Sequence, residues 1–156
     1  MISTTANRPI LLVEHHTTDI FQTFHALKKN HVKNEVIVVR DGLEALDYLF
    51  GSGKYAGQTT ILPEVIILDV NLPKVGGMEV LAQIRAAERT RNLPVIFLTS
   101  SADEQDRIDS HNLGAASCLR KPVDFRNFSD AASQCGLRWL LVDEPKPSSA
   151  RQAAAS

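Results

Sequence analysis

Short apolar runs alternate along the chain with longer segments in which apolar residues recur every three or four positions. The continuous runs cover residues 10–13, 65–68 and 95–98, a weaker one covers 36–39, and the short segment 116–119 is the fifth candidate strand. Short runs rich in β-branched residues, without polar alternation, are typical of strands buried on both faces of a parallel sheet. The sequence therefore predicts five strands of this kind.

The segments between and after these runs predict amphipathic helices. Their apolar stripes are Ile20–Phe24–Leu27–His31, Leu43–Leu46–Leu49, Met78–Leu81–Ile84, a weak one within 103–111, and Phe125–Phe128–Ala132–Cys135–Trp139. Asp41 with Glu44 resembles a capping box at the start of the second stripe, and Gly136 is expected to bend or end the last helix. An alternation of strand and helix repeated five times predicts a doubly wound α/β fold with a five-stranded parallel sheet.

Length and composition indicate one ordinary globular domain. The 156 residues carry 17 basic and 18 acidic side chains, a balance that argues against a broad nucleic-acid-binding surface. Two cysteines are too few for a disulfide scaffold, and no apolar run approaches the ~18 residues of a membrane span, so we expect a cytoplasmic protein without a membrane segment. We predict a flexible leader over 1–8, a folded domain over 9–142 and a disordered Pro/Ser/Ala-rich tail over 143–156.

Four chemically complementary side chains follow the predicted strands. Glu14, Asp69 and Thr99 end three of the apolar runs, and Lys121 follows the fifth by two residues. The carboxyl ends of parallel strands meet at one edge, where ligands bind in this class of fold. Strands also end in polar residues simply because they reach water, but four complementary groups favour a site. They suit phosphoryl transfer to Asp69, with Glu14 holding Mg²⁺ and with Lys121 and Thr99 binding the phosphoryl oxygens.

At these positions the sequence resembles the response-regulator receivers of two-component signalling. The matching motifs are Leu12-Val13-Glu14, Leu68-Asp69-Val70-Asn71-Leu72-Pro73, Gly76-Gly77, Leu98-Thr99-Ser100 and Lys121-Pro122, in an order and spacing that fit about residues 9–140. The resemblance implies that Asp69 is the phosphoacceptor, Thr99 the switch hydroxyl and Lys121 the phosphate-binding lysine. It also implies that the backbone carbonyl of Asn71 is a metal ligand, that the Lys121–Pro122 bond is cis, and that the fold is flavodoxin-like with strand order 2-1-3-4-5.

Within that family the sequence is most similar to the small regulators paired with phytochrome kinases. The similar stretches are Asn34-Glu35, residues 41–46, Gly53-Lys54-Tyr55, Asn71-Leu72-Pro73-Lys74 and Trp139. This resemblance implies a stand-alone receiver, a light-sensing histidine kinase as phosphodonor and an unknown downstream protein partner. It further implies a homodimer through the fourth helix, the fifth strand and the fifth helix.

Two residues depart from the family pattern. His15 stands where a second acidic metal ligand is usual, and Cys118 stands where an aromatic switch residue is common. Imidazole is a poor ligand for Mg²⁺ and a better one for Mn²⁺, so His15 is either a metal ligand that favours Mn²⁺, a titratable cation beside the phosphate or a solvated loop residue. We expect weaker Mg²⁺ binding than the pattern usually supports, and Cys118 either blunts the switch or leaves it to other elements.

Three functions are compatible with these residues. The first is a signalling receiver, not an enzyme, that is phosphorylated on Asp69 and acts through protein contacts. The second is a degenerate receiver that binds its partner without phosphorylation, which His15 and Cys118 favour. The third is a flavodoxin-like small-molecule or flavin binder, whose flavin version a colourless purified protein would exclude. Dinucleotide binding is disfavoured, because the turn over residues 15–18 contains no glycine.

Overall fold

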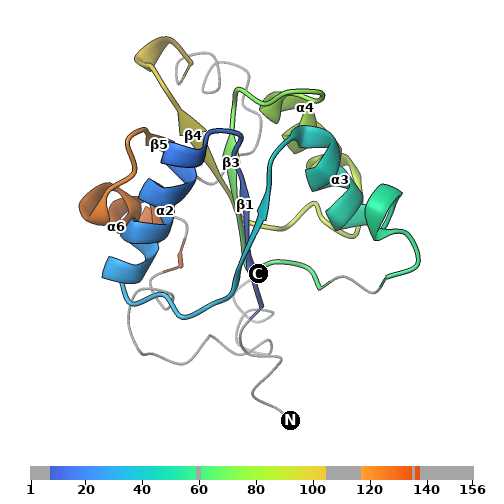
Figure 1. The fold of residues 1–156 in the computed structure, drawn as a ribbon, viewed down its shortest axis with the longest axis horizontal. Coiled ribbons are helices and arrows are strands. Elements are labelled where there is room, and N and C mark those ends of the chain that lie inside the picture. The colour runs from blue at the N-terminus through green and yellow to red at the C-terminus, as the bar shows by residue number, and fades with distance from the viewer. Residues whose placement is uncertain (1–7, 59–60, 105–116, 135, 138–156) are drawn as a thin grey trace.

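The computed structural model describes residues 8–58, 61–104, 117–134 and 136–137 (Figure 1). Its elements in chain order are β1 (Ile10–Val13), α2 (Thr17–Lys29), β2 (Val36–Val39), α3 (Gly42–Phe50), the short 3₁₀ helix η1 (Gly53–Tyr55), β3 (Val65–Asp69), α4 (Gly77–Ala86), β4 (Val95–Thr99), β5 (Ser117–Arg120) and α6 (Phe125–Gln134). None of the helices in these described ranges is long and apolar enough to cross a membrane.

The five strands form one parallel sheet in the order β2-β1-β3-β4-β5, which confirms the predicted flavodoxin-like topology. β1 lies between two neighbours, with Leu12 paired to Val38 on one side and to Ile67 on the other. Every residue of β1, β3 and β4 is buried. That burial explains why these strands appear in the sequence as continuous apolar runs rather than as alternating patterns.

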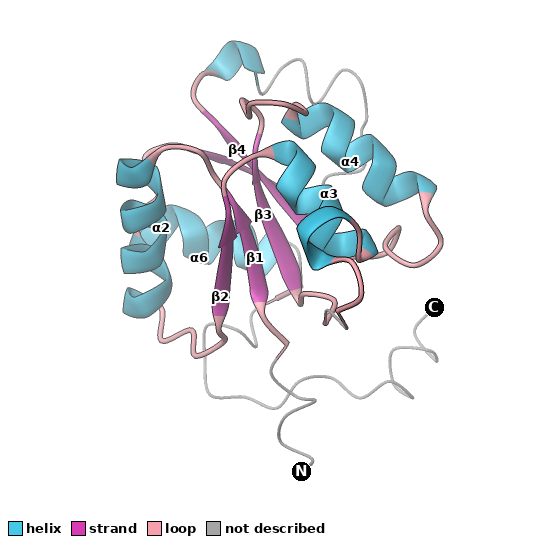
Figure 2. Cartoon of the chain, turned by 45° about the vertical axis from the view of Figure 1, so that its right-hand side comes forward, coloured by secondary structure: helices cyan, strands magenta, loops and turns pink. Residues whose placement is uncertain are grey.

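Helices cover both faces of the sheet (Figure 2). On one face Ile10 and Leu12 join α2 and α6 in a core cluster, and on the other Leu11 and Val13 join α3 and α4. Neighbouring residues of one strand thus belong to opposite layers, as the pleat requires. The sheet is thus packed between two helical layers. This packing holds the carboxyl edge of the sheet, the upper edge in Figure 1, in a fixed position.

The helices agree with the predicted patterns except at three residues. Leu43, expected on the second stripe, is 46% exposed because it lies in the first turn of α3, before the buried Leu46 and Leu49. His31, expected on the first helical stripe, lies beyond the end of α2, because Asn30 caps the helix and His31 adopts a left-handed backbone (φ 62°). Phe125, expected in the core stripe of α6, is the first residue of that helix and is half exposed, whereas Phe128 and Ala132 are buried as expected. Gly136, with φ 75°, lies just past the described end of α6.

The capping box of α3 is confirmed in part. Asp41 Oδ1 accepts a hydrogen bond from Glu44 N at 2.7 Å, but the Glu44 carboxylate accepts from Arg40 N instead of from the cap residue. The predicted leader and tail, the weak helix beyond Glu104, Cys135 and Trp139 lie outside the described residues. The predicted domain boundaries and the predicted dimer surface, which includes that fourth helix, therefore stay predictions.

Candidate functional site

The carboxyl edge of the sheet brings together the four side chains that the strand ends predicted. Asp69 and Thr99 are the last residues of β3 and β4, while Glu14 and Lys121 directly follow β1 and β5. The main chain keeps these ends in register, since Lys121 N donates to Thr99 O at 2.8 Å. Glu14, Asp69 and Thr99 are at most 1% exposed, so this is a buried polar cluster. The Lys121–Pro122 bond is cis, as the resemblance implies.

The Lys121 ammonium lies at the centre of three carboxylates. Its Nζ is 2.8 Å from Asp69 Oδ2, 2.8 Å from Asp19 Oδ2 and 3.0 Å from Glu14 Oε1. Its contacts with Asp69 and Asp19 are hydrogen bonds as well as ion pairs. One cation therefore connects the ends of β1 and β3 with the first turn of α2.

Asp19 is the residue of this cluster that the sequence analysis missed. It is the third residue of α2 and belongs to no motif quoted above. Its position is nevertheless readable from the sequence, because a helix that follows β1 after a three-residue turn starts at the same sheet edge. An acid in the first turn of that helix therefore lies close to Glu14 and to the other strand ends.

Burial and mutual charge shift the ionisation of this cluster. Burial, together with the neighbouring Asp69 carboxylate, raises the pKa of Glu14 to about 7. Burial alone would lower the pKa of Lys121, but its hydrogen bonds to Asp19 and Asp69 outweigh that effect and raise it. The lysine thus stays a cation at neutral pH, whereas the Glu14 carboxyl takes up a proton as the pH falls through about 7.

Two buried oxygen atoms of the site make no hydrogen bond within the described residues. One is Glu14 Oε1, which has Lys121 at ion-pair distance but not in hydrogen-bonding geometry, and the other is Thr99 Oγ1. An unsatisfied buried polar atom costs free energy and is uncommon in folded proteins. Both atoms lie at the edge where ligands bind in this class of fold, so the site is equipped to receive further polar groups.

The loop after β3 is tied both to Asp69 and to the neighbouring loop. Asn71 N donates to Asp69 Oδ1 at 3.1 Å, which holds the second carboxylate oxygen. The Asn71 side chain donates to the Glu104 carboxylate, which also accepts from Ser100 N at 2.8 Å. Ser100, the residue next to Thr99, is therefore linked to the loop after β3 through the side chains of Glu104 and Asn71.

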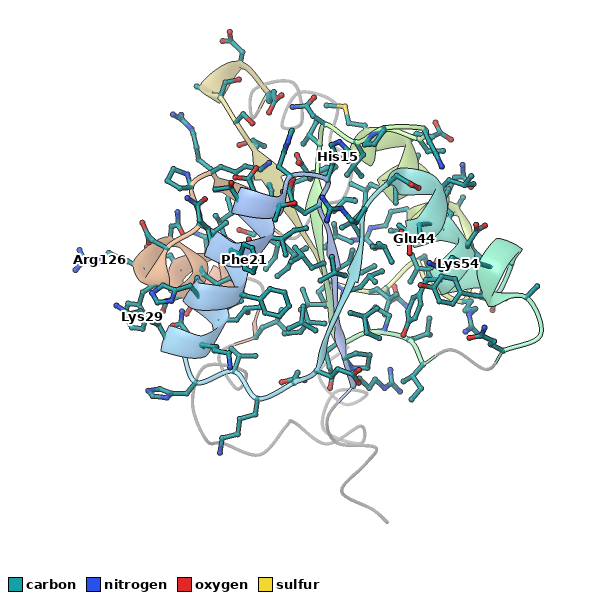
Figure 3. All side chains as sticks on the ribbon, in the orientation of Figure 1. His15, Phe21, Lys29, Glu44, Lys54 and Arg126 are labelled. Atoms are coloured by element: carbon teal, nitrogen blue, oxygen red, sulfur yellow. The ribbon has the colours of Figure 1, made fainter. Side chains whose placement is uncertain are left out.

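The two departures from the family pattern lie in different surroundings. His15 is exposed in the turn after β1 (labelled in Figure 3), and its carbonyl oxygen accepts from the Arg40 guanidinium at 2.6 Å. Cys118 is half buried in β5 and packs against the core layer that contains Phe97. Cys118 therefore fills core space at this point of β5, and the described contacts of His15 are those of a loop residue.

The donor set of the site suits a hard divalent cation. Glu14 and Asp69 offer carboxylate oxygens, one of which, Glu14 Oε1, lacks a hydrogen bond. Mg²⁺ prefers such oxygen ligands and tolerates sites with few protein donors because it retains water. In the part of the chain that the structure describes, no three acidic, His or Cys side chains form a ready-made metal cage. The Lys121 ammonium lies between the carboxylates, so a divalent cation has to share or displace its contacts.

A doubly wound sheet with an acidic cluster and a lysine at its carboxyl edge defines a receiver-type site. The response regulator receiver domain family matches this chain over residues 10–133, and the chain belongs to that family. Response regulator Rcp1 of Synechocystis sp. is 38% identical over 84% of this chain and 88% of its own length.

Solved structures give the same assignment. The bacteriophytochrome response regulator RtBRR superposes with a TM-score of 0.82 at 43% identity, covering 96% of this chain and 90% of its own. The bacteriophytochrome response regulator AtBRR gives 0.81 at 45% identity, covering 88% and 99%. The Mn²⁺-bound form of Rcp1 gives 0.68 at 35% identity, covering 90% and 99%. The predicted similarity to phytochrome response regulators is thereby confirmed.

Proposed function

We propose that this chain accepts a phosphoryl group on Asp69 from a sensor histidine kinase of the phytochrome type and signals through protein contacts in the cytoplasm. The observation that carries the proposal is the position of the Asp69 carboxylate. It ends a central strand and has a cation 2.8 Å from Oδ2. Two of the similar structures are described as bacteriophytochrome response regulators, which supports the choice of kinase.

In the transfer, a carboxylate oxygen of Asp69 attacks phosphorus as the bond from phosphorus to the histidine nitrogen of the kinase breaks. The product is an acyl phosphate on Asp69, and the freed imidazole takes up a proton. Such reactions depend mainly on positioning and on charge stabilisation, which this site provides without a general base. Lys121 neutralises the developing charge, and Thr99 Oγ1, buried and without a described partner, donates to a phosphoryl oxygen.

Glu14, Asp69 and the backbone carbonyl of Asn71 are the residues that would hold Mg²⁺. When bound, Mg²⁺ supplies charge neutralisation at the phosphoryl oxygens. The family affiliation and the Mn²⁺-bound form of the similar Rcp1 support a divalent site here. Mn²⁺ is the ion that we propose can replace Mg²⁺, and we propose His15 as a ligand only for Mn²⁺.

The phosphoryl group alters charge at the edge of the sheet and thereby biases a two-state arrangement around Thr99. The Asn71–Glu104–Ser100 connection gives that change a direct route from the loop after β3 to the loop after β4. The resulting surface change would recruit a downstream protein or a second copy of the chain, through the fourth helix, β5 and α6.

Phosphotransfer from a kinase tests the proposal. A phytochrome-type histidine kinase is first labelled on its histidine and then mixed with the wild-type chain, and with Asp69→Asn as control. We expect label to move to the wild type and not to Asp69→Asn. If the wild-type chain and Asp69→Asn bind the kinase equally well but no label moves to the wild type, the chain is instead a phosphorylation-independent interaction module.

A further inference from the structure

Asp19 forms an ion pair with the lysine of the site although it lies outside every motif that identified the family. Its Oδ2 is 2.8 Å from Lys121 Nζ, the same distance that separates Nζ from Asp69 Oδ2. The Lys121 side chain is 12% exposed and that of Asp19 is 23% exposed, so the pair is largely shielded from solvent. A shielded pair of this kind has a stronger influence than an ion pair on the open surface.

The main chain at Asp19 is fixed by its neighbours. Thr23 Oγ1 donates to Asp19 O at 2.9 Å, and the adjacent Ile20 is buried in the core. The turn that leads into α2 is held as well, because the Arg40 guanidinium donates to His15 O and to Thr17 Oγ1. The Asp19 carboxylate is therefore presented to Lys121 by rigid surroundings.

Charge counting shows what this carboxylate adds. Glu14, Asp19 and Asp69 together with Lys121 carry two formal negative charges when all are ionised, and without Asp19 the number falls to one. The family pattern usually obtains its third carboxylate from the residue after Glu14, which in this chain is the exposed His15. Asp19 restores the count from the first turn of α2, where its carboxylate shares Lys121 Nζ with Glu14 Oε1, a buried oxygen that lacks a hydrogen bond.

We propose that Asp19 is a positioning residue of the phosphoacceptor site: it holds Lys121 and supplies the negative charge that His15 does not, so that the site attracts a divalent cation. This inference rests on the proposed function. Removing the charge of Asp19 has two effects, and both weaken the binding of a divalent cation. The electrostatic attraction for a divalent cation weakens, and Lys121, released from Asp19, neutralises Glu14 and Asp69 more completely.

The test is a calorimetric titration of the full chain with MgCl₂, for the wild type and for Asp19→Asn. Asparagine keeps the size and an acceptor oxygen but removes the charge, and we expect the Mg²⁺ dissociation constant to rise by roughly tenfold. Glu79→Gln is the matched control, since Glu79 is also the third residue of its helix and is exposed. It removes the same first-turn helix charge and should leave Mg²⁺ binding unchanged.

Rescue separates the proposed role from a purely structural one. Adding His15→Asp to Asp19→Asn returns the third carboxylate to the site and should recover most of the lost affinity. Unfolding of each variant in urea is measured in parallel, because Asp19 also stabilises the start of α2. Lower stability with unchanged Mg²⁺ affinity, or no rescue by His15→Asp, would overturn the proposal, as would a wild type that binds no Mg²⁺. Failure of the proposed function is a separate result, because Mg²⁺ would then bind normally while Asp69 accepts no phosphoryl group.

Discussion

Lys121 N donates to Thr99 O at 2.8 Å, which joins by their main chains the two residues expected to bind phosphoryl oxygens. In the unphosphorylated protein the two side chains differ in their bonding partners. Lys121 Nζ is surrounded by three carboxylates, whereas Thr99 Oγ1 has no hydrogen-bond partner within the described residues. Arrival of a phosphoryl group would therefore change the bonding of both residues at once, and the rigid link between them would carry the change along β4 and β5.

Lys121→Met should destabilise the protein strongly. Loss of the ammonium leaves Glu14, Asp19 and Asp69 without their shared cation, and unpaired buried charges of this kind cost about 3 kcal/mol or more. Urea unfolding at pH 7.5 measures the loss, which should shrink at pH 5 because Glu14, whose pKa is raised to about 7, then binds a proton. Lys54→Met is the control: its side chain is 64% exposed in an ion pair with Glu44 (both labelled in Figure 3), so its loss should change stability far less than Lys121→Met does. Equal losses for the two variants would contradict the account.

Glu14→Gln should stabilise the protein in a pH-dependent way. Burial, together with the neighbouring Asp69 carboxylate, raises the Glu14 pKa from its ordinary 4.5 to about 7, so between these values the folded state holds a proton that the unfolded state releases. The contribution of Glu14 to stability therefore falls as the pH rises through this interval. The variant should gain on the order of 2 kcal/mol over the wild type at pH 8 and little at pH 5. Urea unfolding at four pH values between 5 and 8 checks this, and a constant difference would contradict it.

Gly77→Ala should disturb Asp69, the proposed phosphoacceptor, directly. A Cβ at this position would lie 2.3 Å from Asp69 O and 2.8 Å from Val70 Cα, and both are main-chain atoms that cannot rotate away. We expect a loss of about 1–3 kcal/mol in unfolding free energy, together with slower phosphorylation of Asp69. Gly76→Ala is the neighbouring control, because a Cβ there meets no atom within 4 Å and its φ of −68° suits alanine. Similar behaviour of the two variants would show that this close approach is unimportant.

Thr99→Val should separate stability from function. The Thr99 hydroxyl is buried without a described partner, so replacing it with a methyl group of the same shape should leave stability unchanged or raise it by up to about 1 kcal/mol. Binding of the phosphoryl analogue beryllofluoride, followed by NMR, should weaken in the same variant. In Thr90→Val the lost hydroxyl donates to Ile84 O at 2.7 Å, and we expect a loss of stability with normal analogue binding. The reverse pattern would remove Thr99 from the proposed site.

The strands were predictable because burial on both faces forces continuous apolar runs, as in β1 and β3. Their order in the sheet was not readable from those runs and was predicted from the resemblance to receivers. Asp19 was missed because an acid in the first turn of a helix has a local explanation, the helix dipole, which hides a tertiary contact. The apolar periodicity also ran past the buried part of two helices. His31 continues the stripe of α2 but follows its cap residue, and Phe125 continues the stripe of α6 but is its first residue. Patterns fix the face of a helix more reliably than the residue where its packing stops.

The central claim is that Asp69 accepts a phosphoryl group, and intact-mass measurement tests it most directly. The full chain is incubated with a small acyl-phosphate donor and Mg²⁺, with Mn²⁺ in parallel, and Asp69→Asn is treated identically. We predict that the wild type gains the mass of one phosphoryl group and that Asp69→Asn gains none. Gain with Mn²⁺ alone would assign His15 a role in metal choice. An unchanged wild-type mass with both ions, in protein that binds the metal, would contradict the account.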